Sequence, residues 1–85
     1  SWLGPVPMAK IMLKLPKLAV SMQEGTLREW FVESGNQVTL GQPIYALETE
    51  KTTVEIESPF EGTFTCIGEV GETYKVGEPI AEIVQ

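Results

Sequence analysis

The chain has 85 residues, of which 12 are acidic and six are basic, so its formal net charge at pH 7 is −6. This length suits a single small domain with one thin core. The acidic balance argues against nucleic acid as a partner, because binding to phosphates depends on lysine and arginine.

Two further classes of site are disfavoured by composition. With no histidine and a single cysteine, the chain offers no zinc site and no Cys-His nucleophile. It also has no apolar run long enough to cross a bilayer and no recognisable signal peptide, so we expect a soluble module without a membrane partner. The acidity itself suits either docking onto basic partner surfaces or solubility alone.

The first seven residues differ from the rest of the chain. Residues 1–7 carry no charged side chain and precede Met8. We interpret them as a tag remnant ahead of a native start, with a natural disordered leader as the alternative. Residues 8–85 are then expected to form one small domain.

Short strand signals follow one another from Lys10 to the C-terminus. Each is a short run rich in β-branched, aromatic or aliphatic residues, and no window keeps helical apolar spacing long enough to predict a helix. The chain is therefore predicted to be all-β. In chain order, the predicted strands are 10–15, 27–33, 37–39, 44–49, 52–57, 63–67, 73–75 and 80–84. The clearest turn signals between them are Gly25, 34–36, 41–43, 58–59, Gly68, Gly71 and 77–79.

The predicted core consists of apolar positions within and beside these strands. In the fifth strand, Val54 and Ile56 alternate with polar residues, which is typical of a strand with one buried face. The full set of predicted core residues is Val20, Leu27, Val38, Ile44, Leu47, Val54, Ile56, Phe64, Ile67, Val76, Ile80 and Ile83.

The chain contains an internal repeat. Glu24-Gly25-Thr26-Leu27 matches Glu61-Gly62-Thr63-Phe64 at an offset of 37 residues (61 − 24). Further on, Gly35, Gly41, Pro43 and Ile44 match Gly71, Gly77, Pro79 and Ile80 at an offset of 36 (71 − 35). Two copies are too few for a solenoid. They suit two small sheets that close on each other about a pseudo-twofold axis.

Lys51 is the most informative residue. It lies between two strand signals, which places it at a hairpin tip in the link between the two repeats. An ammonium group at such a tip contributes little to a core, and its Glu50 neighbour is too exposed to form a strong ion pair. The pattern favours covalent use of the amine, as the attachment point for a group added by a modifying enzyme.

The residues around Lys51 resemble a known family. Glu48-Thr49-Glu50-Lys51-Thr52 is similar to the Glu-Thr-Asp-Lys-Ala motif of lipoyl domains, with Glu50 in place of Asp and Thr52 in place of Ala. Members of that family also tend to carry a glycine sixteen residues before the lysine, a glutamate three before it and a glycine eleven after it. Gly35, Glu48 and Gly62 occupy these positions, and the resemblance extends over about residues 11–84.

This resemblance implies a fold and a site. The fold is a flattened β-barrel or sandwich of two four-stranded antiparallel sheets, with the lysine at one end and both termini near the other. Segment 19–25 would form a loop near the lysine. Lipoate would be joined to Lys51 by an amide bond, with a reach of roughly 15 Å over about a dozen bonds. The residues implied in recognition by the lipoylating enzyme are Gly35, Glu48, Thr49, Glu50, Thr52 and Gly62.

The implied function is that of an acyl and electron carrier in a 2-oxo acid or acetoin dehydrogenase complex. The isolated domain would be monomeric and would catalyse nothing by itself. The implied partners are a lipoate ligase or lipoyltransferase, a thiamine-diphosphate E1 decarboxylase, an E2 acyltransferase core and the E3 flavoprotein dihydrolipoamide dehydrogenase. The resemblance places such a carrier in the bacterial cytoplasm or, as an alternative, in the mitochondrial matrix.

Three alternatives share parts of this pattern. A biotin carboxyl carrier domain would hold biotin on Lys51, but its lysine is typically flanked as Met-Lys-Met, where this chain has Glu50 and Thr52. A glycine-cleavage carrier also bears lipoate, but that family is longer and has helices. The third alternative is a plain β interaction domain whose lysine is never modified.

Overall fold

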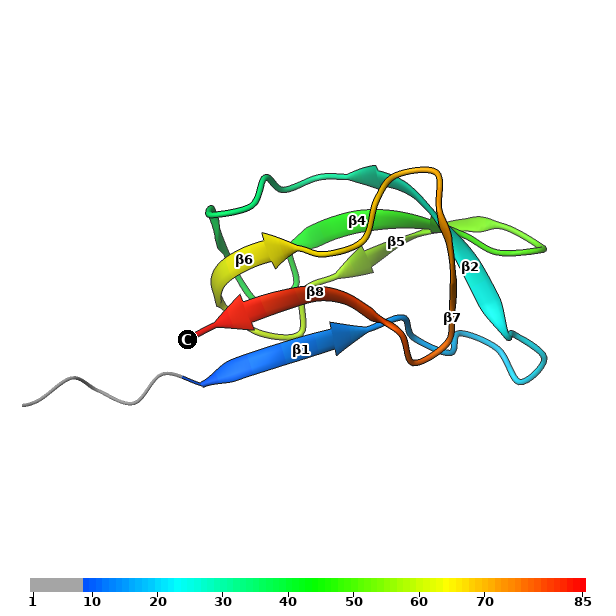
Figure 1. The fold of residues 1–85 in the computed structure, drawn as a ribbon, viewed down its shortest axis with the longest axis horizontal. Coiled ribbons are helices and arrows are strands. Elements are labelled where there is room, and N and C mark those ends of the chain that lie inside the picture. Colours follow the sequence, from blue (N-terminus) through cyan, green and yellow to red (C-terminus); the bar gives the residue numbers. More distant parts are fainter. Residues whose placement is uncertain (1–8) are drawn as a thin grey trace, which may run out of the picture.

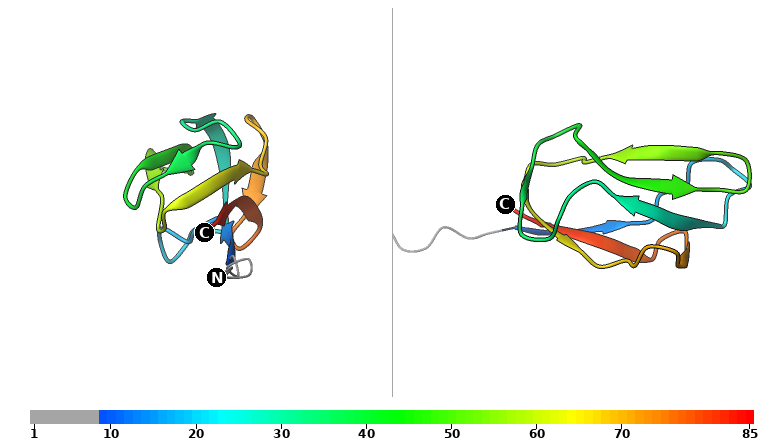
Figure 2. Two further views of the ribbon diagram at one scale, coloured as in Figure 1. Left: turned by 90° about the vertical axis from the view of Figure 1, so that its left-hand side faces the viewer. Right: turned by 90° about the horizontal axis from the view of Figure 1, so that it is seen from above.

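The computed structural model describes residues 9–85. They form eight short strands that lie in two antiparallel sheets facing each other across the core (Figures 1 and 2). The strands are β1 (Lys10–Lys14), β2 (Glu24–Trp30), β3 (Gln37–Val38), β4 (Pro43–Glu48), β5 (Thr53–Glu57), β6 (Gly62–Cys66), β7 (Thr73–Lys75) and β8 (Pro79–Val84). The prediction for residues 1–7 lies outside the described residues. Within residues 9–85, no helix is long and apolar enough to cross a membrane.

The sheets are four-stranded, with the orders β1-β8-β6-β3 and β5-β4-β2-β7. All strand pairs are antiparallel. Within residues 9–85 no ladder joins one sheet to the other, so the sheets form a sandwich rather than a closed barrel. The predicted all-β class and the two four-stranded antiparallel sheets are confirmed.

The internal repeat appears as a pseudo-twofold relation between the sheets. Read along the two sheet orders, β1 corresponds to β5, β8 to β4, β6 to β2 and β3 to β7. The backbone hydrogen bonds repeat as well. Gly71 N donates to Leu27 O at 2.8 Å, and its counterpart Gly35 N donates to Phe64 O at 2.7 Å. The predicted duplication is therefore confirmed at the level of individual bonds.

Ten of the twelve predicted core residues lie in the core or pack against it. Val20 and Ile67 do not, since they are 94% and 44% exposed. Val20 lies in a turn closed by the hydrogen bond from Met22 N to Ala19 O, and the middle of a turn projects into solvent. Ile67 follows β6, whose period-2 alternation directs Phe64 inward and leaves Ile67 on the outer side. The buried hydrophobic residues absent from the prediction are Leu15, Met22, Val32, Tyr45, Ala46 and Ala81.

Gly25 was predicted to mark a turn, but it lies inside β2 opposite Tyr74. The prediction is wrong because this glycine allows a close approach between β2 and β4 and does not change the direction of the chain. A β-carbon at this position would stand 2.8 Å from Leu47 Cδ1 and 3.3 Å from Glu48 O. β2 therefore covers Glu24–Trp30 instead of the predicted 27–33, so it begins three residues earlier (27 − 24) and ends three residues earlier (33 − 30).

Four other glycines do occupy turns with a left-handed backbone. The φ angles are 95° for Gly35, 84° for Gly41, 94° for Gly71 and 93° for Gly77. A β-carbon added at any of them would meet nothing within 4 Å, so backbone conformation alone requires glycine there.

We expect Gly41→Ala and Gly77→Ala each to lower the free energy of unfolding by about 1 kcal/mol, because alanine is strained at positive φ. Urea denaturation of the unmodified proteins measures this. The matched control is Lys51→Ala, an exposed substitution expected to stay within about 0.5 kcal/mol of the wild type. A Lys51→Ala protein less stable than Gly77→Ala would identify Lys51 as a structural residue.

Tyr45 on β4 is 2% exposed, and burial raises the pKa of its phenol from 10.0 to about 12. Because the folded-state pKa lies above the unfolded one, the contribution of Tyr45 to stability is complete below pH 10 and is lost as the pH rises toward 12. We expect a loss of up to about 2 to 3 kcal/mol, at about 1.4 kcal/mol per pH unit. Denaturation between pH 9 and pH 12, compared with Tyr45→Phe, measures it. Parallel curves for the two proteins would contradict the expectation.

The sandwich is elongated, and its two ends differ. β1 begins and β8 finishes at one end, on the left of Figure 1, whereas the β4–β5 hairpin projects from the other. The hairpin carries Lys51, so the predicted separation between the lysine and the ends of the described chain is confirmed.

Candidate functional site

The tip of the β4–β5 hairpin, residues 49–52, is organised by Thr49. Its backbone N–H donates to Thr52 O at 2.7 Å, and its hydroxyl donates to the same oxygen at 3.1 Å. The hydroxyl oxygen accepts from Lys51 N at 3.4 Å and from Thr52 N at 3.3 Å. The side chain of Thr49 therefore forms hydrogen bonds with several backbone groups of the tip and fixes the position from which Lys51 projects.

The Lys51 side chain is exposed, and within residues 9–85 its amine has no hydrogen-bonding or ion-pair partner. The ion pair formed by the described residues joins Arg28 Nη2 and Glu48 Oε1 at 3.0 Å on neighbouring strands. Both of these side chains are about half exposed, so the pair stabilises the fold only weakly. Lys51 is thus a free primary amine held at the end of the molecule.

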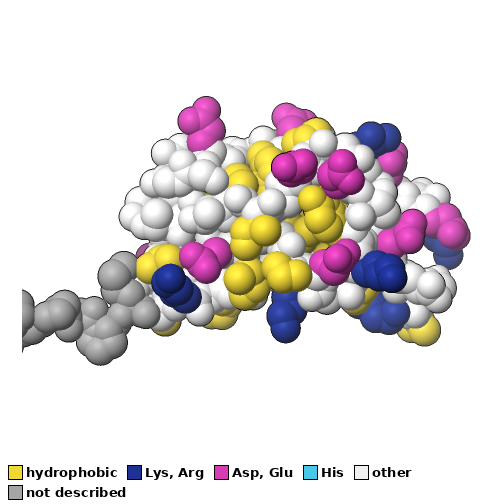
Figure 3. All heavy atoms as spheres, in the orientation of Figure 1, with side chains coloured by type: hydrophobic (Ala, Val, Ile, Leu, Met, Phe, Trp, Pro, Cys, Tyr) yellow, Lys and Arg dark blue, Asp and Glu magenta, His cyan; other side chains and the backbone are white. Residues whose placement is uncertain are grey.

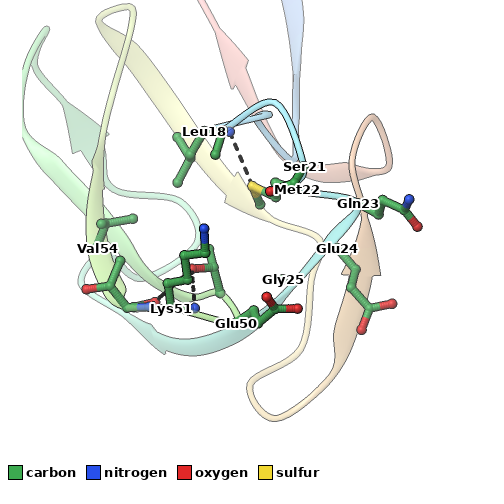
Figure 4. Close-up of a pocket in the computed structure, with 12 residues that line it drawn as sticks. Leu18, Ser21, Met22, Gln23, Glu24, Gly25, Glu50, Lys51 and Val54 are labelled. Carbon is green, nitrogen blue, oxygen red and sulfur yellow. Dashed lines mark hydrogen bonds between the residues drawn. The ribbon is translucent and has the colours of Figure 1, made fainter.

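A groove separates the hairpin tip from the β1–β2 loop, residues 15–23, and we call it the tip groove. Its volume is about 790 Å³. Figure 4 shows the amine of Lys51 pointing across it toward Leu18 and Met22, while Glu50 turns to the side of Gly25. The residues that line the tip groove are Leu18, Ala19, Ser21, Met22, Gln23, Glu24, Gly25, Thr49, Glu50, Lys51, Thr52 and Val54.

The β1–β2 loop is fixed by contacts to Met22. This side chain is 8% exposed, and its Sδ accepts a hydrogen bond from Leu18 N at 3.2 Å. Lys17 Nζ donates to Met22 O at 2.7 Å, which ties a second point of the loop to the same residue. The loop was predicted to lie near the lysine, and this placement is confirmed by the shared lining of the tip groove.

The position of the Lys51 amine is suited to the covalent attachment of another group. An exposed and unpaired amine on a rigid hairpin tip is accessible to a modifying enzyme and can form an amide without breaking any interaction of the fold. A model of the biotin/lipoyl family, described as biotin-requiring enzyme, matches residues 11–83. The chain belongs to the biotin/lipoyl family.

Curated relatives of this biotin/lipoyl domain occur in several enzyme complexes. It is 40% identical, over 89% of its length, to the lipoamide acyltransferase component of the branched-chain alpha-keto acid dehydrogenase complex of Bacillus subtilis strain 168, of which it covers 18%. It is 40% identical, over 84% of its length, to the pyruvate dehydrogenase E1 component subunit beta of Rhizobium meliloti strain 1021, of which it covers 16%.

A third relative is the dihydrolipoyllysine-residue acetyltransferase component of the acetoin cleaving system of Cupriavidus necator. The identity is 42% over 62% of the biotin/lipoyl domain and 14% of that relative. The chain therefore spans less than a fifth of the length of the curated relatives described here.

The structure gathers some of the predicted site residues of the biotin/lipoyl domain and separates others. Glu48, Thr49, Glu50 and Thr52 lie on or beside the hairpin tip with Lys51. Gly35 and Gly62 are not among the tip groove residues. Gly62 opens β6 beside Val84, at the end of the sandwich where β8 finishes (Figure 1).

The two distant glycines have backbone roles. Gly35 has a left-handed φ and donates its N–H to Phe64 O. Gly62 has a φ of 149°, and a β-carbon there would stand 2.5 Å from Val84 O. Backbone conformation explains the glycine at position 35, and the close approach to Val84 explains the glycine at position 62. A role of either glycine in recognition by a lipoylating enzyme stays a prediction.

Sequence reasoning did not single out Leu18, Met22 and Val54 as site residues. Leu18 and Met22 belong to the segment between the first two strands, and the groove arises only when β2 pairs with β4 and brings that segment beside the hairpin. The available signal was the run of small and apolar residues in 18–22, which continues past the end of β1.

Proposed function

We propose that this domain is a swinging-arm carrier that holds lipoate in amide linkage to Lys51. The observation that carries the proposal is the free, exposed Lys51 amine on a hairpin tip flanked by Glu48, Thr49 and Glu50. Similar acyltransferase components are named for lipoamide and dihydrolipoyllysine, which supports lipoate over biotin.

The residues of the chain have simple roles in this proposal. Lipoate supplies a dithiolane that can accept an acyl group and two electrons. Lys51 tethers it through the amide, and Thr49 holds the tip so that the tether leaves the fold in one direction. The domain itself is non-catalytic and provides recognition and mobility.

The proposed partners are those of a 2-oxo acid or acetoin dehydrogenase complex: an E1 decarboxylase, an E2 acyltransferase core, an E3 flavoprotein and the lipoate ligase or lipoyltransferase. The negative surface charge supports docking onto basic rims around the active sites of these partners. The chain carries a net charge of −6, and acidic side chains are spread over the face shown in Figure 3. Complementary fields of this kind increase the rate of encounter with a basic surface.

An acylation assay tests the carrier function. The lipoylated domain is incubated in turn with decarboxylases specific for pyruvate, for 2-oxoglutarate and for branched-chain 2-oxo acids, and with an acetoin-cleaving E1, each with its substrate. We expect intact-mass spectra to show an acyl group gained from at least one of these enzymes. The unmodified domain is the control and should gain none. Failure of the lipoylated domain with all four would contradict the proposal.

The residues that flank Lys51 are expected to determine whether the modifying enzymes attach lipoate or biotin. We expect Glu50→Met combined with Thr52→Met to shift modification from lipoate toward biotin, because both side chains border Lys51 on an exposed tip that the modifying enzymes must contact. Competition between a lipoate ligase and a biotin ligase on the double variant measures the shift. Unchanged lipoylation with no biotin uptake would show that these neighbours do not determine the choice.

A further inference from the structure

Part of the lining of the tip groove is apolar, and Lys51 lines the same groove. Leu18 is 46% exposed, and Val54 packs against the core while still lining the groove. Met22 closes the side toward the core at 8% exposure. These side chains come from the β1–β2 loop and from β5, so they face Lys51 from the far side and from beside it (Figure 4).

The unmodified Lys51 side chain is poorly suited to this lining. Placing an ammonium group against apolar side chains is unfavourable, because the charge loses part of its hydration. Amide formation removes that charge and adds a chain of methylene groups, and burial of such groups is favourable. Acylation therefore removes the charge that disfavours contact between the Lys51 side chain and the apolar part of the lining, and it adds methylene groups for which this contact is favourable.

We propose that the tip groove is a resting site for the acyl arm on Lys51, with the arm's hydrocarbon chain packed against Leu18, Met22 and Val54. This inference depends on the proposed function for the identity of the arm. The arm is favoured over a separate ligand because its point of attachment is itself part of the lining, which makes its local concentration high. The loop that forms the far wall is already held by the bonds to Met22, so little ordering is needed for the arm to settle.

The contact is expected to be weak and reversible. The groove is open, Leu18 is half exposed, and a flexible chain loses rotational freedom when it packs. The arm is thereby kept near the fold between encounters, and a partner's active site can withdraw it. Two carboxylates, those of Glu24 and Glu50, also line the groove and disfavour an anionic arm in it.

Methyl NMR of the modified domain tests the resting site. The lipoylated protein, with its mass confirmed first, is labelled at leucine, valine and methionine methyl groups. We expect cross-peaks between the methylene protons of the arm and the methyl groups of Leu18, Met22 and Val54. Leu18→Ser should lose or strongly weaken the cross-peaks to Met22 and Val54. The matched control is Val20→Ser, which changes a residue on the same loop that is 94% exposed and lies outside the groove.

A second preparation makes the result independent of any modifying enzyme. Changing Lys10, Lys14, Lys17 and Lys75 to arginine leaves Lys51 as the one lysine of the chain, and an arginine at position 17 still carries donors for Met22 O. An activated octanoyl ester then acylates Lys51 and the N-terminal amine, and the product that carries the octanoyl group on Lys51 alone is purified and identified by peptide mapping. The same cross-peaks should appear with the octanoyl arm. Absence of arm cross-peaks to Leu18, Met22 and Val54 in both preparations would overturn the resting site, even where lipoylation of Lys51 is established. Absence of enzymatic lipoylation alongside octanoyl contacts to Leu18 and Val54 would overturn the assignment of lipoate while supporting the groove.

Discussion

Lys51→Arg is expected to abolish attachment completely while leaving the fold intact. Arginine keeps the positive charge, but its guanidinium stays protonated and cannot act as the amine nucleophile. The Lys51 side chain is exposed and makes no interaction within residues 9–85, so the change in unfolding free energy should stay within about 0.5 kcal/mol. Intact-mass spectrometry after coexpression with a lipoate ligase measures the first effect, and thermal denaturation measures the second.

The matched control for this substitution is Lys75→Arg on β7, which is also exposed and lies outside the tip groove. It should be modified as fully as the wild type. A lipoyl adduct that persists in the Lys51→Arg protein would place the attachment on another amine and would contradict the proposed function.

Gly62→Ala is expected to cause the largest loss of stability among the substitutions considered. The φ of Gly62 is 149°, and the added β-carbon would stand 2.5 Å from Val84 O and 2.6 Å from Ile83 Cγ2. To accommodate it, β6 must move away from β8 at the Thr63–Val84 pair, which opens the sheet over the buried Ile83. We expect a loss of roughly 2 to 4 kcal/mol, combining backbone strain with overpacking. In a domain of this size, that corresponds to a fall in Tm of roughly 10 to 25 °C.

Gly41→Ala provides the comparison for Gly62→Ala, since Gly41 also has a positive φ, of 84°, but has open space around the added methyl group. Urea denaturation should place Gly62→Ala well below Gly41→Ala in stability. A Gly62→Ala protein as stable as Gly41→Ala would show that the close approach to Val84 is relieved cheaply. A folded Gly62→Ala protein that is no longer lipoylated would support a role of Gly62 in recognition.

Every strand of the fold was predictable from local pattern, because short runs bounded by glycine and proline leave few alternatives. Those residues matched in the repeat that lie in strands belong to β2 and β6 and to β4 and β8, and the sheet orders relate the same strands. The errors occurred where a residue's role depends on its neighbours in space. Gly25 resembles a turn residue along the chain, yet its function is to let Leu47 pack against β2. Val20 and Ile67 are apolar, but a turn and the strand alternation direct them into solvent.

The candidate site was predictable to a similar extent. The hairpin position of Lys51 follows from the two flanking strand signals, and Thr49, Glu50 and Thr52 are its neighbours in sequence as well as in space. The tip groove was not predictable, since Leu18 and Val54 come together only when β2 pairs with β4 and brings the β1–β2 loop beside the hairpin. The hydrogen bond from Leu18 N to Met22 Sδ, which shapes the loop, has no sequence signature.

The most direct test of lipoate attachment is peptide mapping by mass spectrometry of protein made in cells with active lipoylating and biotinylating enzymes. We predict a lipoyl group on the peptide that contains Lys51, with Lys10, Lys14, Lys17 and Lys75 unmodified. A biotinyl group on Lys51, a lipoyl group on any other lysine, or an unmodified Lys51 despite lipoylation of a known carrier in the same cells would contradict it.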